Sequence, residues 1–378
     1  MLRSRLGRAL VARLRAARAK DVPTAVNWDL TYACPLRCGH CYSESGRRSA
    51  RQLPLESLLR IADAILAVRP APTVTFSGGE PLLVRGFTDV ARRLREGGAT
   101  TSLYTSGFRL RDETARSIAE VFDRVAVSLD GPDAATNDFL RERAGAFDEA
   151  MRAAERLDVL AGSGAFSFGL EVTIMRSNWS TLDRFVTEVA SRLPHLSYLH
   201  LGALIPTGLA SRATFVEREL LDDAQMAELP ALEKRLGRAA PRTLRVRVFS
   251  NLPFLMHPKQ LRWGLGLDRL IKIEADGRVR GMDIYEGTVG SLLEEPLSSI
   301  FPRTLERHAD PFVVRELTRV RTMRDWASAC RAIDLHFASG EDRARILQRQ
   351  PALPVPPALV ASSAPPSPRR KVALDLLS

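Results

Sequence analysis

Short apolar runs alternate with longer amphipathic runs between residue 26 and about residue 236 of this 378-residue chain. Such alternation predicts parallel strands, each joined to the next by a helix in a right-handed crossover. We expect six strands, at Val26–Thr31, Thr73–Phe76, Thr101–Thr105, Arg124–Leu129, Phe166–Met175 and Tyr198–Leu204. We expect the helices between them at Leu55–Val68, Val84–Glu96, Glu113–Phe122, Ala146–Leu160 and Thr181–Leu193. The pattern therefore predicts an α/β fold with its functional residues at the carboxyl ends of the strands.

A different pattern follows after about residue 240. Leu244–Phe249 is typical of a strand, and Asp276-Gly277 predicts a hairpin turn. The two hairpin strands and two later helices are expected at Ile271–Glu274, Arg278–Met282, Phe312–Arg331 and Glu341–Gln348. We interpret the chain as four parts: a basic amphipathic N-terminal helix (residues 1–22), an α/β core (23–238), a small α+β module (239–350) and a disordered tail rich in proline and serine (351–378).

Most of the net charge of +11 belongs to the two ends of the chain. Residues 1–20 contain seven arginines and lysines and no acidic residue, while the middle of the chain is nearly neutral. The charge therefore does not indicate nucleic-acid binding. Leucines at every fourth position of the same segment predict a helix that either docks on its own domain, as we expect, or contacts a membrane surface or an acidic partner.

The sequence contains no signal for export or for a membrane span. No apolar stretch reaches the length of about 18 residues that a transmembrane helix needs. Arginines interrupt the N-terminal apolar run that a signal peptide would require. The four cysteines are too few for a disulfide framework, and their spacing indicates metal binding in a reducing compartment. We therefore expect a cytoplasmic protein.

Cys34, Cys38 and Cys41 lie within eight residues, directly after the first predicted strand. Three thiolates on so short a loop can ligate three irons of a cubane cluster. The fourth iron then keeps an open coordination position, which a catalytic metal centre needs and a structural one avoids. The alternative is a zinc site completed by His40, although zinc ligands usually come as two separated pairs.

The CxxxCxxC spacing resembles the hallmark of the radical S-adenosylmethionine (radical SAM) superfamily, in which an aromatic residue usually stands at the position of His40. The resemblance implies a partial (β/α)6 barrel that holds one four-iron–four-sulfur (4Fe-4S) cluster. In this family the open iron binds S-adenosyl-L-methionine, and one electron from the cluster cleaves it to a 5′-deoxyadenosyl radical that abstracts hydrogen from the substrate. We assign no catalytic residue beyond the cluster ligands.

Four further motifs at the ends of predicted strands match the same family: Gly78-Gly79-Glu80-Pro81, Thr105-Ser106-Gly107, Ser128-Leu-Asp130-Gly131 and Pro206-Thr207-Gly208. Gly78-Gly79-Glu80-Pro81 resembles its GGE motif, whose backbone and glutamate hold the methionine amino group. The chemistry agrees, because glycines allow close approach and a carboxylate accepts hydrogen bonds from an ammonium group. By the same resemblance, the remaining cofactor contacts fall on His40, Ser106, Ser128, Asp130, Arg141 and Thr207. Each of these residues alone is also compatible with an ordinary turn or surface position.

Two motifs resemble peptide-modifying members in particular. Ser128-Leu-Asp130-Gly131 resembles their SLDG signature, and Asp138-Phe-Leu-Arg141 resembles the HDxxR sequence that follows it, with Asn137 in place of the usual histidine. By the resemblance, Arg141 pairs with the carboxylate of S-adenosylmethionine through its planar donor fork.

Residues 271–301 resemble a SPASM or twitch extension, a module that normally brings cysteines for auxiliary clusters. Met282 stands where a ligand cysteine is common, and Cys330 alone remains near the usual C-terminal cysteine group. One thiol cannot hold a cubane cluster. We therefore expect a degenerate extension without an auxiliary cluster, in which Cys330 is a small buried residue.

The resemblance favours a maturase that modifies a ribosomally synthesised peptide and receives electrons from a low-potential donor of the flavodoxin or ferredoxin type. A small-molecule substrate, such as a tetrapyrrole, a sugar or a cofactor precursor, is an open alternative, since no separate leader-peptide-recognition domain is evident in the sequence. A non-catalytic iron–sulfur or zinc protein is a second alternative. Glu80 and the pair Ser128 and Asp130 argue against it, because cluster binding alone needs none of them.

Overall fold

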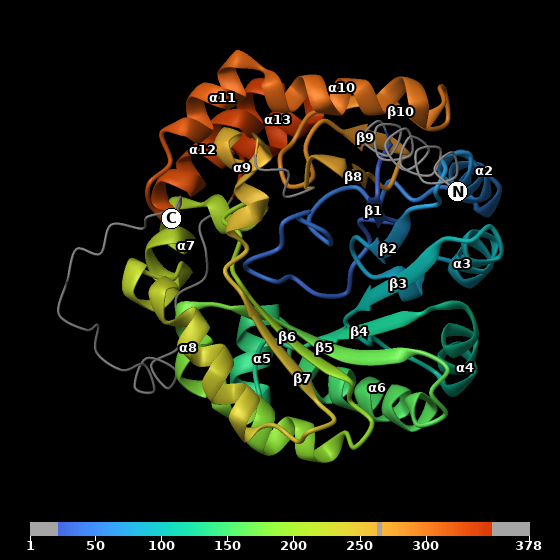
Figure 1. The fold of residues 1–378 in the computed structure, drawn as a ribbon, viewed down its shortest axis with the longest axis vertical. Coiled ribbons are helices and arrows are strands. Elements are labelled where there is room, and N and C mark those ends of the chain that lie inside the picture. Colours follow the sequence, from blue (N-terminus) through green and yellow to red (C-terminus); the bar gives the residue numbers. More distant parts are fainter. Residues whose placement is uncertain (1–21, 263–266, 350–378) are drawn as a thin grey trace, which may run out of the picture.

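The computed structural model describes residues 22–262 and 267–349, and the predicted N-terminal helix and C-terminal tail lie largely or wholly outside them. One sheet runs through the structure in the strand order β10-β9-β8-β1-β2-β3-β4-β5-β6-β7. Figure 1 shows this sheet curving around a central space, with helices on its outer side. The predicted α/β fold with a parallel, partly closed barrel is confirmed.

Seven strands pair in parallel and in chain order. They are β1 (Ala25–Asp29), β2 (Thr73–Ser77), β3 (Thr100–Thr105), β4 (Arg124–Ser128), β5 (Ser167–Ile174), β6 (Tyr198–Ala203) and β7 (Arg245–Phe249). At the other edge, β8 (Leu270–Ile273) pairs in parallel with β1, and β9 (Arg278–Arg280) and β10 (Thr288–Ser291) continue the sheet in antiparallel pairs.

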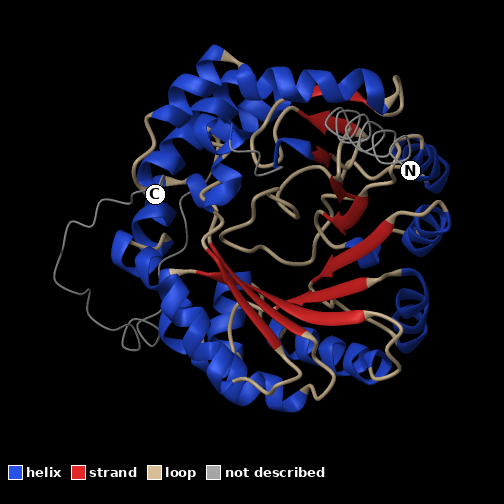
Figure 2. Ribbon diagram, viewed as in Figure 1, coloured by secondary structure: helices blue, strands red, loops and turns tan. Residues whose placement is uncertain are grey.

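Most helices lie against the outer side of the sheet (Figures 1 and 2). The α-helices are α2 (Leu55–Leu66), α3 (Phe87–Glu96), α4 (Asp112–Val121), α5 (Ala134–Arg141), α6 (Ala146–Ala161), α7 (Ala213–Glu219), α8 (Asp223–Ala239), α9 (Pro258–Arg262), α10 (Leu297–Ala309), α11 (Pro311–Thr318), α12 (Met323–Phe337) and α13 (Gly340–Leu347). Short 3-10 helices cover Pro81–Leu83, Arg176–Thr181, Ala190–Arg192, Gly208–Ser211, Leu252–Leu255 and Leu267–Arg269, and Phe185–Val189 is a π-helix. None of the helices among the described residues is long and apolar enough to cross a membrane.

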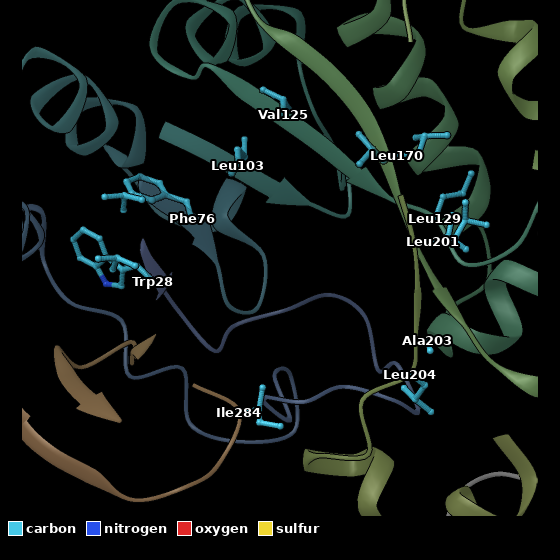
Figure 3. Close-up of a cluster of buried hydrophobic side chains, with 14 of the residues drawn as sticks. Trp28, Phe76, Leu103, Val125, Leu129, Leu170, Leu201, Ala203, Leu204 and Ile284 are labelled. Carbon is cyan, nitrogen blue, oxygen red and sulfur yellow. The ribbon is translucent and has the colours of Figure 1, made fainter. Parts of the chain in front are cut away.

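The strands alternate between apolar residues that face the helices and polar residues that face the centre. Figure 3 shows part of the apolar set, drawn from β1 to β6: Trp28, Phe76, Leu103, Val125, Leu170 and Leu201. Each of these six side chains is fully buried, and burial stabilises the fold by about 1.5–3 kcal/mol for a side chain of this size. The intervening positions, among them Asn27, Thr75, Tyr104, Ser128 and Glu171, line a cavity. Successive side chains of a strand point to opposite faces of the sheet. This alternation places the hydrophobic core on the helix side and polar residues on the cavity side.

The C-terminal region is continuous with the barrel sheet. The strand predicted at Leu244–Phe249 is β7, which pairs with β6, and the first strand of the predicted hairpin is β8, which pairs with β1. Our expectation of a separate α+β module missed these pairings. They satisfy backbone groups that would otherwise be exposed along the edges of a six-stranded sheet. The division of the chain near residue 238 stays a prediction.

Two predicted helices differ from the structure. Phe312–Arg331 is divided between α11 and α12, because Thr322 caps α12: its hydroxyl accepts a hydrogen bond from the Asp325 amide, and the Asp325 carboxylate accepts one from the Thr322 amide. Thr181–Leu193 forms a π-helix flanked by 3-10 turns in place of a regular α-helix.

Candidate cofactor site at the carboxyl ends of the strands

A cavity of about 400 Å³ lies inside the curve of the sheet. The loops that follow the strands cross this central space in Figure 2. All three clustered cysteines line the cavity, together with seven of the ten residues predicted to contact the cofactor: His40, Gly78, Gly79, Ser106, Ser128, Arg141 and Thr207. The structure therefore brings together residues from five separate strand ends. Glu80, Pro81 and Asp130 lie behind the wall and are buried.

The three cysteines are half-buried free thiols. Burial raises the pKa of the Cys34 thiol to about 12 and that of Cys38 above its usual range, with Arg141 opposing the rise at both. Buried thiolates are stable beside metal cations, which supply the missing positive charge. In the described ranges, no three or more His, Cys, Asp or Glu side chains converge closely enough to hold a single metal ion. A cubane cluster presents its irons to separate thiols, so its ligands need not converge on one ion.

Backbone contacts hold the cysteine loop on two sides. The Arg37 and Gly39 amides donate to the carbonyls of Arg141 and Leu140, at the end of α5. The Leu209 amide, in the loop after β6, donates to the Cys41 carbonyl at 3.0 Å. The loop is thus fixed by elements that follow β4 and β6 in the chain.

The two glycines of the GGE motif pack against the backbone that leads to the cysteines. The Gly79 amide donates to the Thr31 carbonyl at 2.7 Å, and the Glu80 amide donates to the Ala33 carbonyl at 2.9 Å. A Cβ atom on Gly79 would lie 2.1 Å from the Ala33 oxygen, so no larger residue fits. The glycines therefore allow a close approach between two protein segments, in addition to their place on the cavity wall.

The Glu80 carboxylate is turned away from the cavity and is fully buried. One oxygen accepts from the Thr105 hydroxyl at 2.6 Å and the Leu82 amide at 3.1 Å, and the other accepts from the amide and hydroxyl of Ser106. Burial raises the pKa of Glu80, and these hydrogen bonds oppose the rise. The carboxylate thus positions Ser106 on the wall. A direct contact between Glu80 and the cofactor stays a prediction.

The Asp130 carboxylate is also surrounded by protein groups, and its predicted contact with the cofactor stays a prediction. Its carboxylate lies 2.7 Å from the Arg141 Nε atom and 3.3 Å from the His40 Nε2 atom, and it accepts from the Thr173 amide at 2.9 Å. Both Arg141 and His40 are on the cavity wall, whereas Asp130 is not. Asn137, at the position where histidine is usual, accepts from the Asp130 amide at 2.9 Å. The asparagine therefore supports the same network.

The C-terminal region contributes site residues that the sequence analysis did not identify. Lys272 on β8 donates to the Asp29 carboxylate at 2.7 Å and to the Tyr42 hydroxyl at 2.8 Å. Asp283 accepts from the Asn27 amide group at 3.0 Å, and burial raises the pKa of its carboxyl. Lys272, Asp283, Tyr42 and Asn27 all line the cavity. The sequence did contain a signal for two of these site residues, because Asn27 and Lys272 are polar residues between apolar neighbours that are buried.

The loop after β6 is tied to the same region. The Thr207 hydroxyl donates to the Ile284 carbonyl at 2.7 Å, so this predicted cofactor residue also closes the cavity against the C-terminal segment. Met282 is buried, and Cys330 is fully buried with its pKa raised by burial. The absence of an auxiliary cluster stays a prediction.

Residues 28–166 match the family model of the radical SAM superfamily, so this part of the chain belongs to that superfamily. Mycofactocin maturase MftC of Mycolicibacterium smegmatis is 33% identical over 192 residues, which are 50% of this chain and 47% of that protein. The chain thus aligns with about half the length of this curated relative. AdoMet-dependent heme synthase of Nitratidesulfovibrio vulgaris is 22% identical over 85% of this chain and 87% of that protein.

A solved structure shares the fold over most of the chain. Streptococcus suis SuiB bound to S-adenosylmethionine superposes with a TM-score of 0.61 and 14% identity, over 91% of this chain and 80% of that one. The same protein bound to its precursor peptide SuiA gives a TM-score of 0.59 at 14% identity, over 93% and 80%. At this level of identity, the likeness shows a common fold.

Proposed function

We propose that this radical SAM protein binds a 4Fe-4S cluster on Cys34, Cys38 and Cys41 and S-adenosyl-L-methionine in the adjoining cavity. When bound, these groups supply a one-electron cleavage that produces a 5′-deoxyadenosyl radical for hydrogen abstraction. The observation that carries the proposal is the shared wall: the three thiols face one cavity with the loops that follow β2, β3, β4 and β6. The donor set fits, because it combines soft thiols for iron with polar groups for an amino acid and a ribose.

The residues of this chain then bind and orient the cofactor. Arg141 offers a planar donor fork to a carboxylate, and Asp130 holds the guanidinium in place from behind. Ser106 and Ser128 offer hydroxyls, and Glu80 fixes the first of these. The Ile284 segment, held by Thr207, helps to separate the cavity from solvent, as radical chemistry requires.

We infer further that the substrate is a ribosomally synthesised peptide. The likeness to a mycofactocin maturase and to SuiB, whose structure contains a precursor peptide, supports this substrate class. A tetrapyrrole is the second candidate, favoured by the heme synthase that aligns over most of this chain.

Product analysis tests both the radical chemistry and the substrate class. Anaerobically reconstituted protein should contain iron and sulfide and should convert S-adenosylmethionine to 5′-deoxyadenosine when dithionite is the reductant. Stoichiometric zinc without iron, or no 5′-deoxyadenosine, would refute the radical chemistry. A synthetic peptide from a neighbouring precursor gene and an iron coproporphyrin are then offered separately. Mass change in the porphyrin alone would refute the peptide assignment and leave the radical chemistry standing.

A further inference from the structure

A hollow of about 310 Å³ opens on the surface at the carboxyl end of β3. It shares no lining residue with the cofactor cavity. Four of its seven lining residues are arginines: Arg109, Arg111, Arg152 and Arg156. We call this surface the arginine hollow.

Three of these arginines carry uncompensated charge. Arg156 pairs with Asp112 at 2.7 Å. Arg109, Arg111 and Arg152 are exposed, and none of them has an acidic partner within the described parts of the chain. Glu149, the single acidic lining residue, lies 3.8 Å from Arg143. The lining of the arginine hollow therefore carries a net positive charge.

The arginine hollow is preformed by close packing. Gly107 has a φ of +76°, and a Cβ atom there would lie 2.5 Å from the Cβ atom of Ala153 on α6. The loop after β3 thus lies directly on α6, which keeps Arg109 and Arg111 beside Arg152. Little ordering of the loop backbone is therefore needed when a partner binds such a surface.

Two contacts connect the arginine hollow to the cysteine loop. The Arg143 guanidinium donates to the Pro35 carbonyl at 3.1 Å, immediately after Cys34 in the chain. The same guanidinium lies 4.6 Å above the ring of Phe108, and the Arg109 guanidinium lies 5.1 Å from that ring. Phe108 and Arg143 therefore link the arginine hollow to the loop that holds the cysteines.

We propose that the arginine hollow docks an acidic electron-carrier protein of the flavodoxin or ferredoxin class. This proposal rests on the cluster assigned under the proposed function. The reduced carrier loses one electron, the cysteine-bound centre gains it, and no bond is made or broken at the arginine hollow. Electron-transfer complexes are typically small, transient and steered by complementary charge. The positively charged lining of the arginine hollow agrees with that type of contact.

A peptide substrate fits this surface less well. Peptides usually bind by adding a strand to a sheet edge or by filling an apolar groove. The edge strands of this sheet are β7 and β10, whereas the arginine hollow lies beside β3 and α6, in the middle of the strand order. Leu110 is its one apolar lining side chain and is buried.

Binding of an acidic flavodoxin to the reconstituted protein tests the proposal directly, with titration calorimetry as the readout. The variant with Arg109→Glu, Arg111→Glu and Arg152→Glu should bind at least about tenfold more weakly, and its affinity should depend less on salt. The matched control carries Arg238→Glu, Arg242→Glu and Arg245→Glu, three exposed arginines on α8, in the following loop and at the start of β7. This control should bind within about twofold of wild type.

Stopped-flow reduction separates this proposal from the preceding one. The triple variant at the arginine hollow should be reduced by dithionite at the wild-type rate and by flavodoxin more slowly, with an unchanged melting temperature. If the triple variant unfolds, Arg152→Ser alone should still weaken flavodoxin binding. An equal loss of flavodoxin affinity in the control variant, or an unchanged flavodoxin affinity in the triple variant at the arginine hollow, would overturn the docking proposal. Loss of precursor-peptide binding in place of flavodoxin binding would overturn it too, while failure of dithionite to reduce wild type would refute the cluster itself.

Discussion

The Lys272 ammonium lies 2.7 Å from the Asp29 carboxylate, although 243 positions separate the two residues in the chain. The Tyr42 and Ser77 hydroxyls donate to the same carboxylate oxygen at 2.8 Å and 2.9 Å. One buried carboxylate therefore joins the ends of β1 and β2, the cysteine loop and strand β8. This contact makes the C-terminal region part of the candidate cofactor site.

Removing the lysine should be costly because it leaves a buried charge without its partner. We expect Lys272→Met to lower the free energy of unfolding by about 3–5 kcal/mol, measured by urea denaturation. Adding Asp29→Asn should restore part of this loss, since the amide oxygen still accepts from Tyr42 and Ser77. If the free energy of unfolding of Lys272→Met alone lies within about 1 kcal/mol of the wild-type value, the pair is not important for stability.

Iron content should depend on three of the four cysteines. We expect about four irons per chain after anaerobic reconstitution, and loss of the cluster in Cys34→Ala, Cys38→Ala or Cys41→Ala. Cys330→Ala is the matched control and should retain its iron, because Cys330 is buried in the C-terminal region away from the cavity wall. About eight irons on a folded monomer would instead indicate an auxiliary cluster.

Glu80 should affect stability and cofactor binding without affecting the cluster. Glu80→Ala leaves the Thr105 and Ser106 donors without their buried acceptor, which we expect to destabilise the fold by about 2–3 kcal/mol. S-adenosylmethionine affinity should weaken as well, because Ser106 is no longer held on the wall. Glu80→Gln keeps an acceptor and should lie between wild type and Glu80→Ala in both measurements. Loss of iron in either variant would contradict this role.

Stability should depend on pH through Asp334 on α12. Burial, and secondarily the neighbouring Glu286 carboxylate, raise the pKa of Asp334. The Asp334 carboxylate accepts from the Glu286 amide at 2.9 Å, lies 3.7 Å from Arg349, and has Cys330 nearby on its own helix. The folded protein therefore holds a proton that the unfolded chain releases above about pH 4, the ordinary carboxyl value.

The expected result is a loss of stability as the pH rises above about 4, until Asp334 is ionised in the folded protein too. Asp334→Asn should remove this part of the pH dependence in urea-denaturation series. Glu286 has the opposite shift, a pKa lowered by Arg280 and Arg345 despite burial, so its contribution is lost only at pH values below about 4. Parallel curves for wild type and Asp334→Asn would contradict the assignment.

Local patterns predicted much of this architecture. The six predicted strands correspond to β1 to β6 with ends that differ by two residues or fewer, because apolar runs of this length bury one face of a strand. The predicted strand ends also carry Gly78, Ser106, Ser128 and Thr207, all of which line one cavity. Parallel strands place their carboxyl ends at one edge of a sheet, so this convergence follows from chain order alone.

The orientation of the predicted side chains did not follow from their positions. Glu80 and Asp130 stand in motifs that suggest direct cofactor contacts, which stay predictions, and in this structure each carboxylate faces protein donors. Which way a carboxylate turns depends on the donors that a neighbouring strand places beside it. For Glu80 the donors other than the Leu82 amide come from β3 and the residue after it, some 25 positions further along the chain.

The sequence by itself determined the strand–helix alternation and the cysteine loop after the first strand, since both depend on residues close together in the chain. Only the tertiary structure decided that β7 and β8 extend the barrel sheet and that Lys272 and Asp283 reach its cavity. The physical reason is that pairing at a sheet edge is non-local. Either edge of β1 to β6 offered unpaired backbone groups, and packing of the whole chain selected the strands that satisfied them.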